Sequence, residues 1–226
     1  MKKTILTLTA FLAFSFQTKM FAQKNRFDIA FITGPNYIWL VGNKIIEDFY
    51  RPTIRYSSGL NLNYHFHKRF SLMSGLLYER KGAASNIIVT DVTGHQTGTA
   101  RLSNNFDYLI VPLAARVAFG KKFKMFLGAG GYGAYLLKAT NELSSDILPQ
   151  SKTRIDSVFK KFDFGFLLNF GVSVPIFERI SISLEARDNI GYYNIATPSV
   201  FQNQPVKTRS LNVLLGITWA VSKRKV

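Results

Sequence analysis

A strict alternation of apolar and polar residues marks the stretch from Phe162 to Val174, which reads FDFGFLLNFGVSV. Every second residue from Phe162 is large and apolar, whereas the residues between them are small or polar, except Leu167. Alternate side chains of a strand point to opposite faces, so this stretch predicts a strand with one wholly apolar face. It is long enough to cross a bilayer, because a transmembrane strand needs about 9–11 residues, apolar toward lipid and polar toward the lumen.

Seven further segments are predicted to be strands by the same alternation. They are 26–41, 55–67, 70–82, 105–119, 123–138, 180–193 and 208–221. The facing of 123–138 stays open, because the segment is rich in glycine. Gly34-Pro35 interrupts the pattern and predicts a bulge or a bend. Pro112 predicts a β-bulge, since proline cannot donate to a ladder.

The connections between these strands alternate between long and short. Polar segments at 42–53, 83–104, 139–160 and 194–207 are predicted to be long loops, whereas short turns lie near 68–69, 120–122 and 175–179. This rhythm predicts an all-β fold, an eight-stranded antiparallel up-and-down transmembrane β-barrel in the outer membrane of a Gram-negative cell. The short turns and both termini are then periplasmic. A soluble barrel with its apolar faces inward is the alternative, and the length and aromatic content of those faces favour the membrane.

Aromatic residues are predicted to form two interfacial girdles. Those near the long-loop ends are Tyr37, Trp39, Tyr56, Tyr78, Tyr108, Tyr192 and Tyr193. Those near the short-turn ends are Phe66, Phe70, Phe119, Phe123, Phe177 and Trp219.

The first 22 residues have the pattern of a cleaved secretory signal. Lys2 and Lys3 precede an apolar run from Ile5 to Phe16, which is too short for a membrane-spanning helix. Cleavage after Ala22 would leave residues 23–226 as one barrel domain. The chain contains no cysteine, so no disulfide stabilises it.

The formal net charge is +16, which favours an anionic partner. Export argues against nucleic acid and favours outer-membrane lipid or lipopolysaccharide. Basic residues gather near the short turns and are predicted to form a periplasmic rim that faces anionic headgroups or an acidic protein partner. The rim residues are Lys68, Arg69, Lys121, Lys122, Arg179, Lys223, Arg224 and Lys225.

Four charged residues fall at inward positions of the predicted strands: Glu79, Arg116, Glu185 and Arg187. In a barrel of eight strands, long side chains can meet across the lumen. We expect Arg116 to pair with Glu185, with Arg187 one layer higher and Glu79 above it, as a structural polar network.

Other motifs carry little chemistry. The run from Gly128 to Gly133 matches G-x-G-x-x-G, but no helix follows as a dinucleotide site requires, so the glycines are interpreted as space for bulky lumen residues. His65 and His67 share a strand face without an evident third metal ligand. No catalytic, cofactor or metal site is predicted.

Four segments resemble the PorT-type outer-membrane β-barrel proteins of Bacteroidetes. They are GLLYERKG (75–82), DYLIVPLAARVAFG (107–120), GAGGYGAYLL (128–137) and SISLEARDNIGYYNI (181–195). The resemblance implies an eight-stranded barrel, and some members of that family take part in type IX secretion. Relatives often carry an acidic residue before the proline of the fourth strand, where this chain has Ile110.

These observations predict an integral outer-membrane protein with a structural or secretion-accessory role, exerted through its loops or its periplasmic rim rather than through catalysis. The alternative is a small enzyme acting on lipid A or phospholipid, with His95 and Asp91 in an external loop. A porin-like diffusion pore is disfavoured, because side chains just fill the interior of eight strands.

Overall fold

The computed structural model describes residues 26–145, 147–197 and 205–221 of the chain. The predicted signal segment 1–22 and the three basic residues Lys223, Arg224 and Lys225 lie outside these ranges. Eight long strands form a ring, in the order β1, β2, β3, β4, β5, β7, β8 and β9. Their bounds are β1 (Arg26–Val41), β2 (Thr53–His65), β3 (Phe70–Thr90), β4 (Gln96–Phe119), β5 (Lys124–Ser145), β7 (Phe162–Pro175), β8 (Ile180–Gly191) and β9 (Lys207–Ala220).

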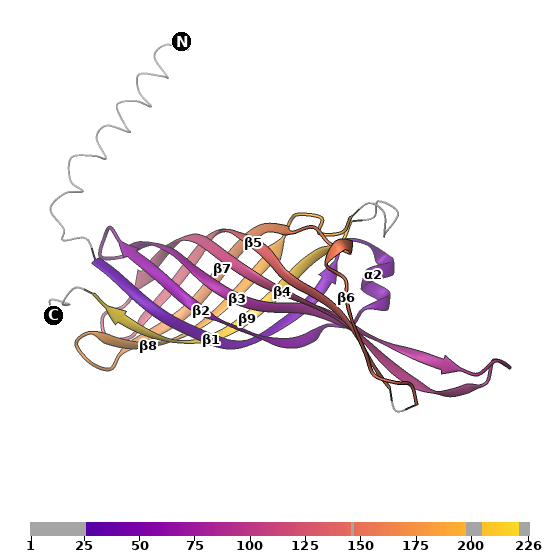
Figure 1. The fold of residues 1–226 in the computed structure, drawn as a ribbon. Helices are drawn as coiled ribbons and strands as arrows, with labels where there is room; N and C mark the ends of the chain where they lie inside the picture. The colour runs from indigo at the N-terminus through magenta and orange to yellow at the C-terminus, as the bar shows by residue number, and fades with distance from the viewer. Residues whose placement is uncertain (1–25, 146, 198–204, 222–226) are drawn as a thin grey trace, which may run out of the picture.

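The ring closes because β1 pairs with β9 as well as with β2, and every pairing is antiparallel. Closure satisfies the backbone hydrogen-bonding groups of all eight strands without leaving an edge in the barrel wall. The first and last strands are therefore neighbours, and both barrel termini lie at the end that carries the short turns (Figure 1). The predicted fold class is confirmed.

The predicted facing is also confirmed. In the stretch that begins β7, Phe162, Phe164 and Phe166 are exposed on the outside, whereas Asp163 and Leu167 are buried inside. Phe166 is 62% exposed in the isolated chain, which is an apolar surface that hydrocarbon would cover. The strand 123–138, whose facing was open, also alternates: Met125 and Leu127 point outward, and Tyr132 and Ala134 inward.

Two of the predicted long loops are wrong, because they contain strand. β3 continues to Thr90 and β4 begins at Gln96, so most of segment 83–104 is a hairpin that projects beyond the barrel (Figure 1). β5 likewise continues to Ser145 and pairs with the short strand β6 (Ser151–Arg154). We call this extension of β3, β4, β5 and β6 the arm. Within the loop predicted at 42–53, Asn43 caps a short helix, α2 (Lys44–Phe49), by accepting a hydrogen bond from the Ile46 amide.

The β-bulge predicted at Pro112 is wrong as well, and Gly34-Pro35 forms no bulge. β1 keeps one register with β2 through Gly34 and Pro35, and β4 keeps one register with β5 through Pro112. Pro112 instead lies where the β3–β4 pairing is interrupted, so its missing N–H removes a rung without shifting the strands. The register shift in the barrel wall falls between Asp107 and Tyr108 of β4, where β5 has one extra residue.

The glycines of β5 allow its neighbours to approach, which leads to a test. A Cβ on Gly130 would lie 2.0 Å from the Leu113 carbonyl oxygen, whereas a Cβ on Gly133 would meet only Phe164 ring carbons at 3.6 Å or more. We therefore expect Gly130→Ala to destabilise the barrel by about 1–3 kcal/mol, the usual cost of overpacking. The measurement is the urea concentration at which half of the folded band in gel electrophoresis is lost, which we call the urea midpoint. Gly133→Ala is the matched control and should leave this midpoint unchanged. Equal midpoints for the two variants would contradict the argument.

Candidate functional site

The lumen is filled by charged side chains that meet across it. Arg116 of β4 donates from Nη2 to both carboxylate oxygens of Glu185 on β8, each at 2.8 Å. A second guanidinium nitrogen of Arg116 donates to Asn63 Oδ1 on β2 at 3.2 Å. Both members of the ion pair are buried, so the bidentate geometry offsets part of the desolvation cost of two charges.

Arg187 joins the same layer instead of forming a higher one. Its Nε donates to Glu185 Oε1 at 2.9 Å, and Asn169 of β7 donates to that oxygen at 2.8 Å. Glu185 is therefore held by two arginines and an amide. The expected stacking of Arg187 above the pair is wrong, because residues two apart on one strand face lie close enough for their long side chains to meet.

Glu79 occupies the next layer with neutral partners. Its carboxylate accepts hydrogen bonds from Ser210 of β9 at 2.5 Å and from Asn189 of β8 at 3.1 Å. Glu79 does not pair with either arginine of the set. Three strands are thus joined through one buried carboxylate.

A further ion pair was missed by the sequence reasoning. Lys81 Nζ lies 3.2 Å from Asp163 Oδ2, and both side chains are fully buried. Lys81 also donates to Thr208 at 2.9 Å and lies over the Tyr132 ring, 4.8 Å from its centroid. The alternation had placed both charges on inward faces, but their pairing required knowing the order of the strands in the ring, in which β7 lies three strands from β3.

An apolar cluster closes the lumen at the long-loop end. Phe106 of β4 packs edge-to-face on Phe159, with ring centroids 4.7 Å apart. Phe159 follows the 3-10 helix η1 (Asp156–Val158), and Ile46 of α2 is buried in the same cluster. Tyr108, expected in the outer aromatic girdle, is buried in this interior because it occupies an even, inward position of β4.

A hollow of about 100 Å³ lies at the short-turn end, lined in part by His65, Asp28 and Arg116. It is smaller than the roughly 300–1,000 Å³ of typical ligand pockets. His65 contacts Asp28 at 2.8 Å, and His67 is exposed in the turn. No group of three metal-ligating side chains occurs among the described residues.

The basic rim residues that the structure describes lie in the three short turns. Lys68, Arg69, Lys121 and Lys122 are exposed there, and Arg179 is partly exposed. Two of these turns are tied to neighbouring strands, since the Ala118 amide donates to the Arg69 carbonyl and the Ala220 amide to that of Arg179. The five charges therefore surround one end of the barrel.

The glycine motif gives room to the lumen network. A Cβ on Gly128 would lie 2.2 Å from Asn169 Oδ1 and 2.7 Å from Arg116 Cγ, two side chains of the Glu185 layer. The glycine is thus needed where Arg116 crosses the lumen.

The residues of the enzyme alternative lie at the tip of the β3–β4 hairpin. Asp91 Oδ1 accepts a hydrogen bond from the Thr93 hydroxyl at 2.6 Å, and that hydroxyl contacts His95 Nδ1 at 2.8 Å. The histidine is therefore not placed between a nucleophile and an orienting carboxylate, as nucleophilic catalysis requires. The same carboxylate also accepts the amides of Thr93 and His95, so the arrangement caps a turn. These hydrogen bonds lower the pKa of Asp91, the Thr93 hydroxyl contributing most.

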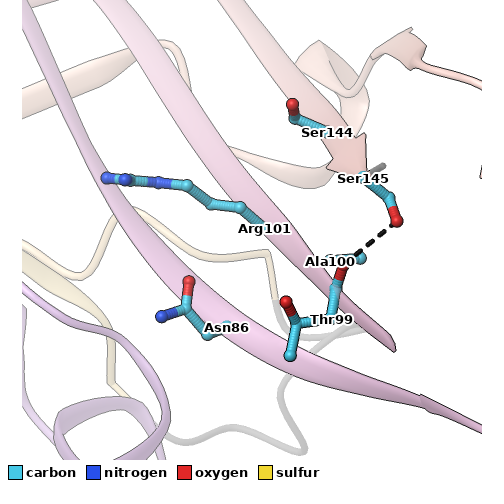
Figure 2. A pocket seen from close by; sticks show the side chains of 6 residues that line it. All are labelled: Asn86, Thr99, Ala100, Arg101, Ser144 and Ser145. Carbon is cyan, nitrogen blue, oxygen red and sulfur yellow. Dashed lines mark hydrogen bonds between the residues drawn. The ribbon is translucent and has the colours of Figure 1, made fainter. Parts of the chain in front are cut away.

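The arm carries a polar hollow of about 260 Å³ (Figure 2). Asn86 of β3, Arg101 of β4 and Ser144 of β5 are paired across three adjacent strands and line it together. Ser145 donates to the Thr99 carbonyl at 3.0 Å and fixes one side. Arg101 is exposed and has no ion pair within the described residues.

Asp156 stabilises the base of the arm through a hydrogen bond and an ion pair. Its carboxylate accepts from the Ala139 amide at 2.6 Å and pairs with Arg154 of β6. The pKa of Asp156 lies below its ordinary value, chiefly because of the Ala139 amide, with Arg154 adding to the effect. The carboxylate thus stays ionised at neutral pH and joins η1 to β5 and β6.

The geometry is that of a closed β-barrel with an apolar outer wall, and the comparison with protein families agrees. Residues 21–195 match the family model described as "Outer membrane protein beta-barrel domain". The match covers more than half of the chain, so the chain belongs to this family of outer-membrane proteins. A search of curated proteins found no match. Among the described residues no helix is long and apolar enough to span a membrane.

Solved structures with a similar fold include three small outer-membrane proteins. Neisserial surface protein A is 14% identical, with a TM-score of 0.49, and the match covers 87% of this chain and 99% of that one. Ail of Yersinia pestis, in complex with the heparin analogue sucrose octasulfate, is 9% identical, with a TM-score of 0.39 over 85% and 99% of the two chains. OprG of Pseudomonas aeruginosa is 10% identical, with a TM-score of 0.37 over 85% and 95%.

The Glu185 layer yields a stability prediction. Arg116→Ala removes the bidentate partner of a buried carboxylate, and breaking such a pair typically costs about 3–5 kcal/mol. We expect the cost here to fall near the lower bound, since Arg187 and Asn169 still contact Glu185. Lys121→Ala, at an exposed turn, is the control and should change stability by less than about 0.5 kcal/mol. The measurement is the urea midpoint of the folded gel band. Indistinguishable midpoints for the two variants would show that the pair contributes nothing.

The sealed lumen predicts the absence of steady conduction. The Glu185 layer, the Lys81–Asp163 pair and the apolar cluster around Phe106 follow one another along the lumen, from the short-turn end to the long-loop end. Purified protein in planar bilayers should therefore show no large, stable single-channel current. A porin-sized steady conductance would refute this description of the lumen.

Proposed function

We propose that this outer-membrane barrel is a non-enzymatic interaction protein, whose arm binds an extended segment of another protein by strand addition to β3. The observation that carries the proposal is the free edge of the arm. From Ser85 to Thr90, β3 pairs with β4 and has no other strand partner among the described residues. An unpaired edge presents a row of backbone donors and acceptors that a further strand can use.

The composition of this edge favours addition. The sequence Ile87-Ile88-Val89-Thr90 is β-branched throughout and contains none of the lysines or prolines that usually protect an edge. Ile88 is 64% exposed on the outer face. The other edge of the arm, β6, is only four residues long and carries Lys152 and Arg154, so it is the poorer template.

The hollow beside the edge indicates the chemistry of the partner. Asn86, on the edge strand itself, and the unpaired guanidinium of Arg101 both line it. Arginine binds a carboxylate with two parallel hydrogen bonds. A partner strand that carries an aspartate or glutamate at this position would therefore satisfy both the backbone edge and Arg101.

The topology supports an orientation with the arm outside the cell. In outer-membrane barrels the short turns are periplasmic and the longer loops external. The five described rim lysines and arginines would then face anionic phospholipid headgroups or an acidic periplasmic protein, and both termini would be periplasmic. A secretion-accessory role, expected from the family resemblance, is one form that partner binding at the arm or rim would take. The alternative function, lipid chemistry by Asp91 and His95, is not favoured, because these two residues cap a turn as described above.

The test uses the absence of cysteine in the chain. A single Ile88→Cys change, labelled with a photo-crosslinker on intact cells, should capture a discrete protein partner. Ser151→Cys on β6 is the matched control at the other edge and should capture little. Adding a second change, Ile88→Cys with Val89→Lys, should reduce the yield about tenfold, because a lysine protects an edge.

The outcomes separate the alternatives. Capture from Ser151 but not from Ile88 would move the contact to the wrong edge and overturn the proposal, as would no capture from either position. Changed lipid A or phospholipid profiles in an Asp91→Ala/His95→Ala strain would favour the enzyme instead. The identity of the captured protein would show whether secretion is involved.

A further inference from the structure

We infer that the outer wall of the barrel at the long-loop end, between β7, β8 and β9, holds a phosphorylated glycolipid of the outer leaflet. The site consists of Lys160 and Lys207 and of the aromatic side chains beside them. This inference rests on the proposed orientation, with the long-loop end at the outer leaflet, and does not depend on the arm.

Two consecutive tyrosines organise the site. Tyr192 and Tyr193 follow β8, and both of their amides donate to the Phe164 carbonyl, at 2.9 Å and 3.2 Å. Lys207 Nζ lies 5.4 Å from the centroid of the Tyr192 ring, and Lys160 Nζ lies 4.6 Å from that of Tyr193. The cation–π contacts hold both ammonium groups against the same part of the wall.

These lysines lack the carboxylate partners that neutralise neighbouring charges. On the same wall Arg209 is paired with Asp188 at 2.7 Å, and farther round the barrel Arg80 is paired with Asp107 at 2.6 Å. Within the described residues, Lys160 and Lys207 form no such ion pair. The wall therefore carries uncompensated positive charge at the level of the aromatic girdle, where lipid headgroups begin.

A continuous aromatic surface lies beside the lysines. The Tyr193 ring packs on Phe164, with centroids 5.9 Å apart, and Phe164 stacks on Phe162 at 6.2 Å. Tyr192 packs on Phe166 at 6.3 Å, which extends the surface along β7. An apolar face continuous with cationic groups matches a ligand that has acyl chains joined to a phosphorylated headgroup.

The experiment measures lipid binding by the folded full-length protein in detergent micelles. The readout is the fluorescence of Trp39, which pairs with Arg209 in the β1–β9 ladder and therefore lies at this wall. The Trp219→Phe change removes the other tryptophan of the chain, so that Trp39 alone is observed. Diphosphorylated lipid A is titrated in parallel with the same glycolipid after removal of its phosphates, and with phosphatidylglycerol. We expect the diphosphorylated form to bind most tightly.

The variants assign the effect to the site. Lys160→Gln/Lys207→Gln should weaken binding of diphosphorylated lipid A roughly tenfold or more and abolish its advantage over the dephosphorylated form. Lys121→Gln/Lys122→Gln removes the same charge at the opposite end and should leave the affinity unchanged. Lys160→Arg/Lys207→Arg keeps the charge and should keep the affinity, which guards against a folding defect in the glutamine variant.

Three results would overturn the inference. They are equal affinity for the phosphorylated and dephosphorylated glycolipid, equal affinity for phosphatidylglycerol, and an equal loss in the Lys121/Lys122 control. None of them bears on strand addition at the arm, which the crosslinking experiment tests separately.

Discussion

Closure of the β1–β9 seam is the constraint on which the rest of the structure depends. Hydrocarbon offers no partner to an unpaired backbone N–H or C=O, so a sheet can lie in a bilayer only when its first and last strands meet. From Asp28 to Val41 the two strands keep one register, which fixes their side-chain facing. A slip of one residue would turn the apolar face of the slipped strand inward and its polar face toward lipid. The alternation that is visible in β7 follows from this requirement.

Closure with eight strands leaves a lumen that side chains can bridge, and this decides where the charges go. The charges buried in its two central layers are those of Lys81, Arg116 and Arg187 and of the carboxylates Glu79, Asp163 and Glu185. Each carboxylate accepts hydrogen bonds from strands other than its own, so the network joins opposite sides of the wall. The same contacts that relieve the burial cost also fill the interior. An interaction with a macromolecule is therefore left to the rims, the outer wall and the arm.

The barrel was predictable from the sequence because apolar and polar residues alternate with a period of two along each strand, and this alternation is visible in the sequence of one strand alone. The arm was not, because residues 83–104 have no clear period and are rich in Thr, Ser, Asn and Gly, a composition typical of loops that outweighed the short β-branched run at 87–90. That segment forms strands because its two halves pair with each other. Pairing between two polar segments requires no apolar–polar alternation, so the sequence of neither half reveals it. The Lys81–Asp163 contact was not predicted for a related reason. The facing of each residue follows from its own strand, but their contact depends on the closed ring, in which β3 and β7 lie three strands apart and face the same lumen.

The position of the free edge follows from the same solvent argument. The β2–β3 pairing ends at Ser57 and Glu79, after which β3 touches the segment before β2 again only at the isolated Arg51–Ala84 bridge. Tyr56 and Tyr78, whose rings lie 5.7 Å apart, mark the aromatic girdle at this height. An edge that began lower would leave backbone groups unpaired in hydrocarbon, whereas above the girdle water can satisfy them until another strand replaces it. The arm therefore begins where an open edge first becomes tolerable, which is also where a partner in solution can first reach it.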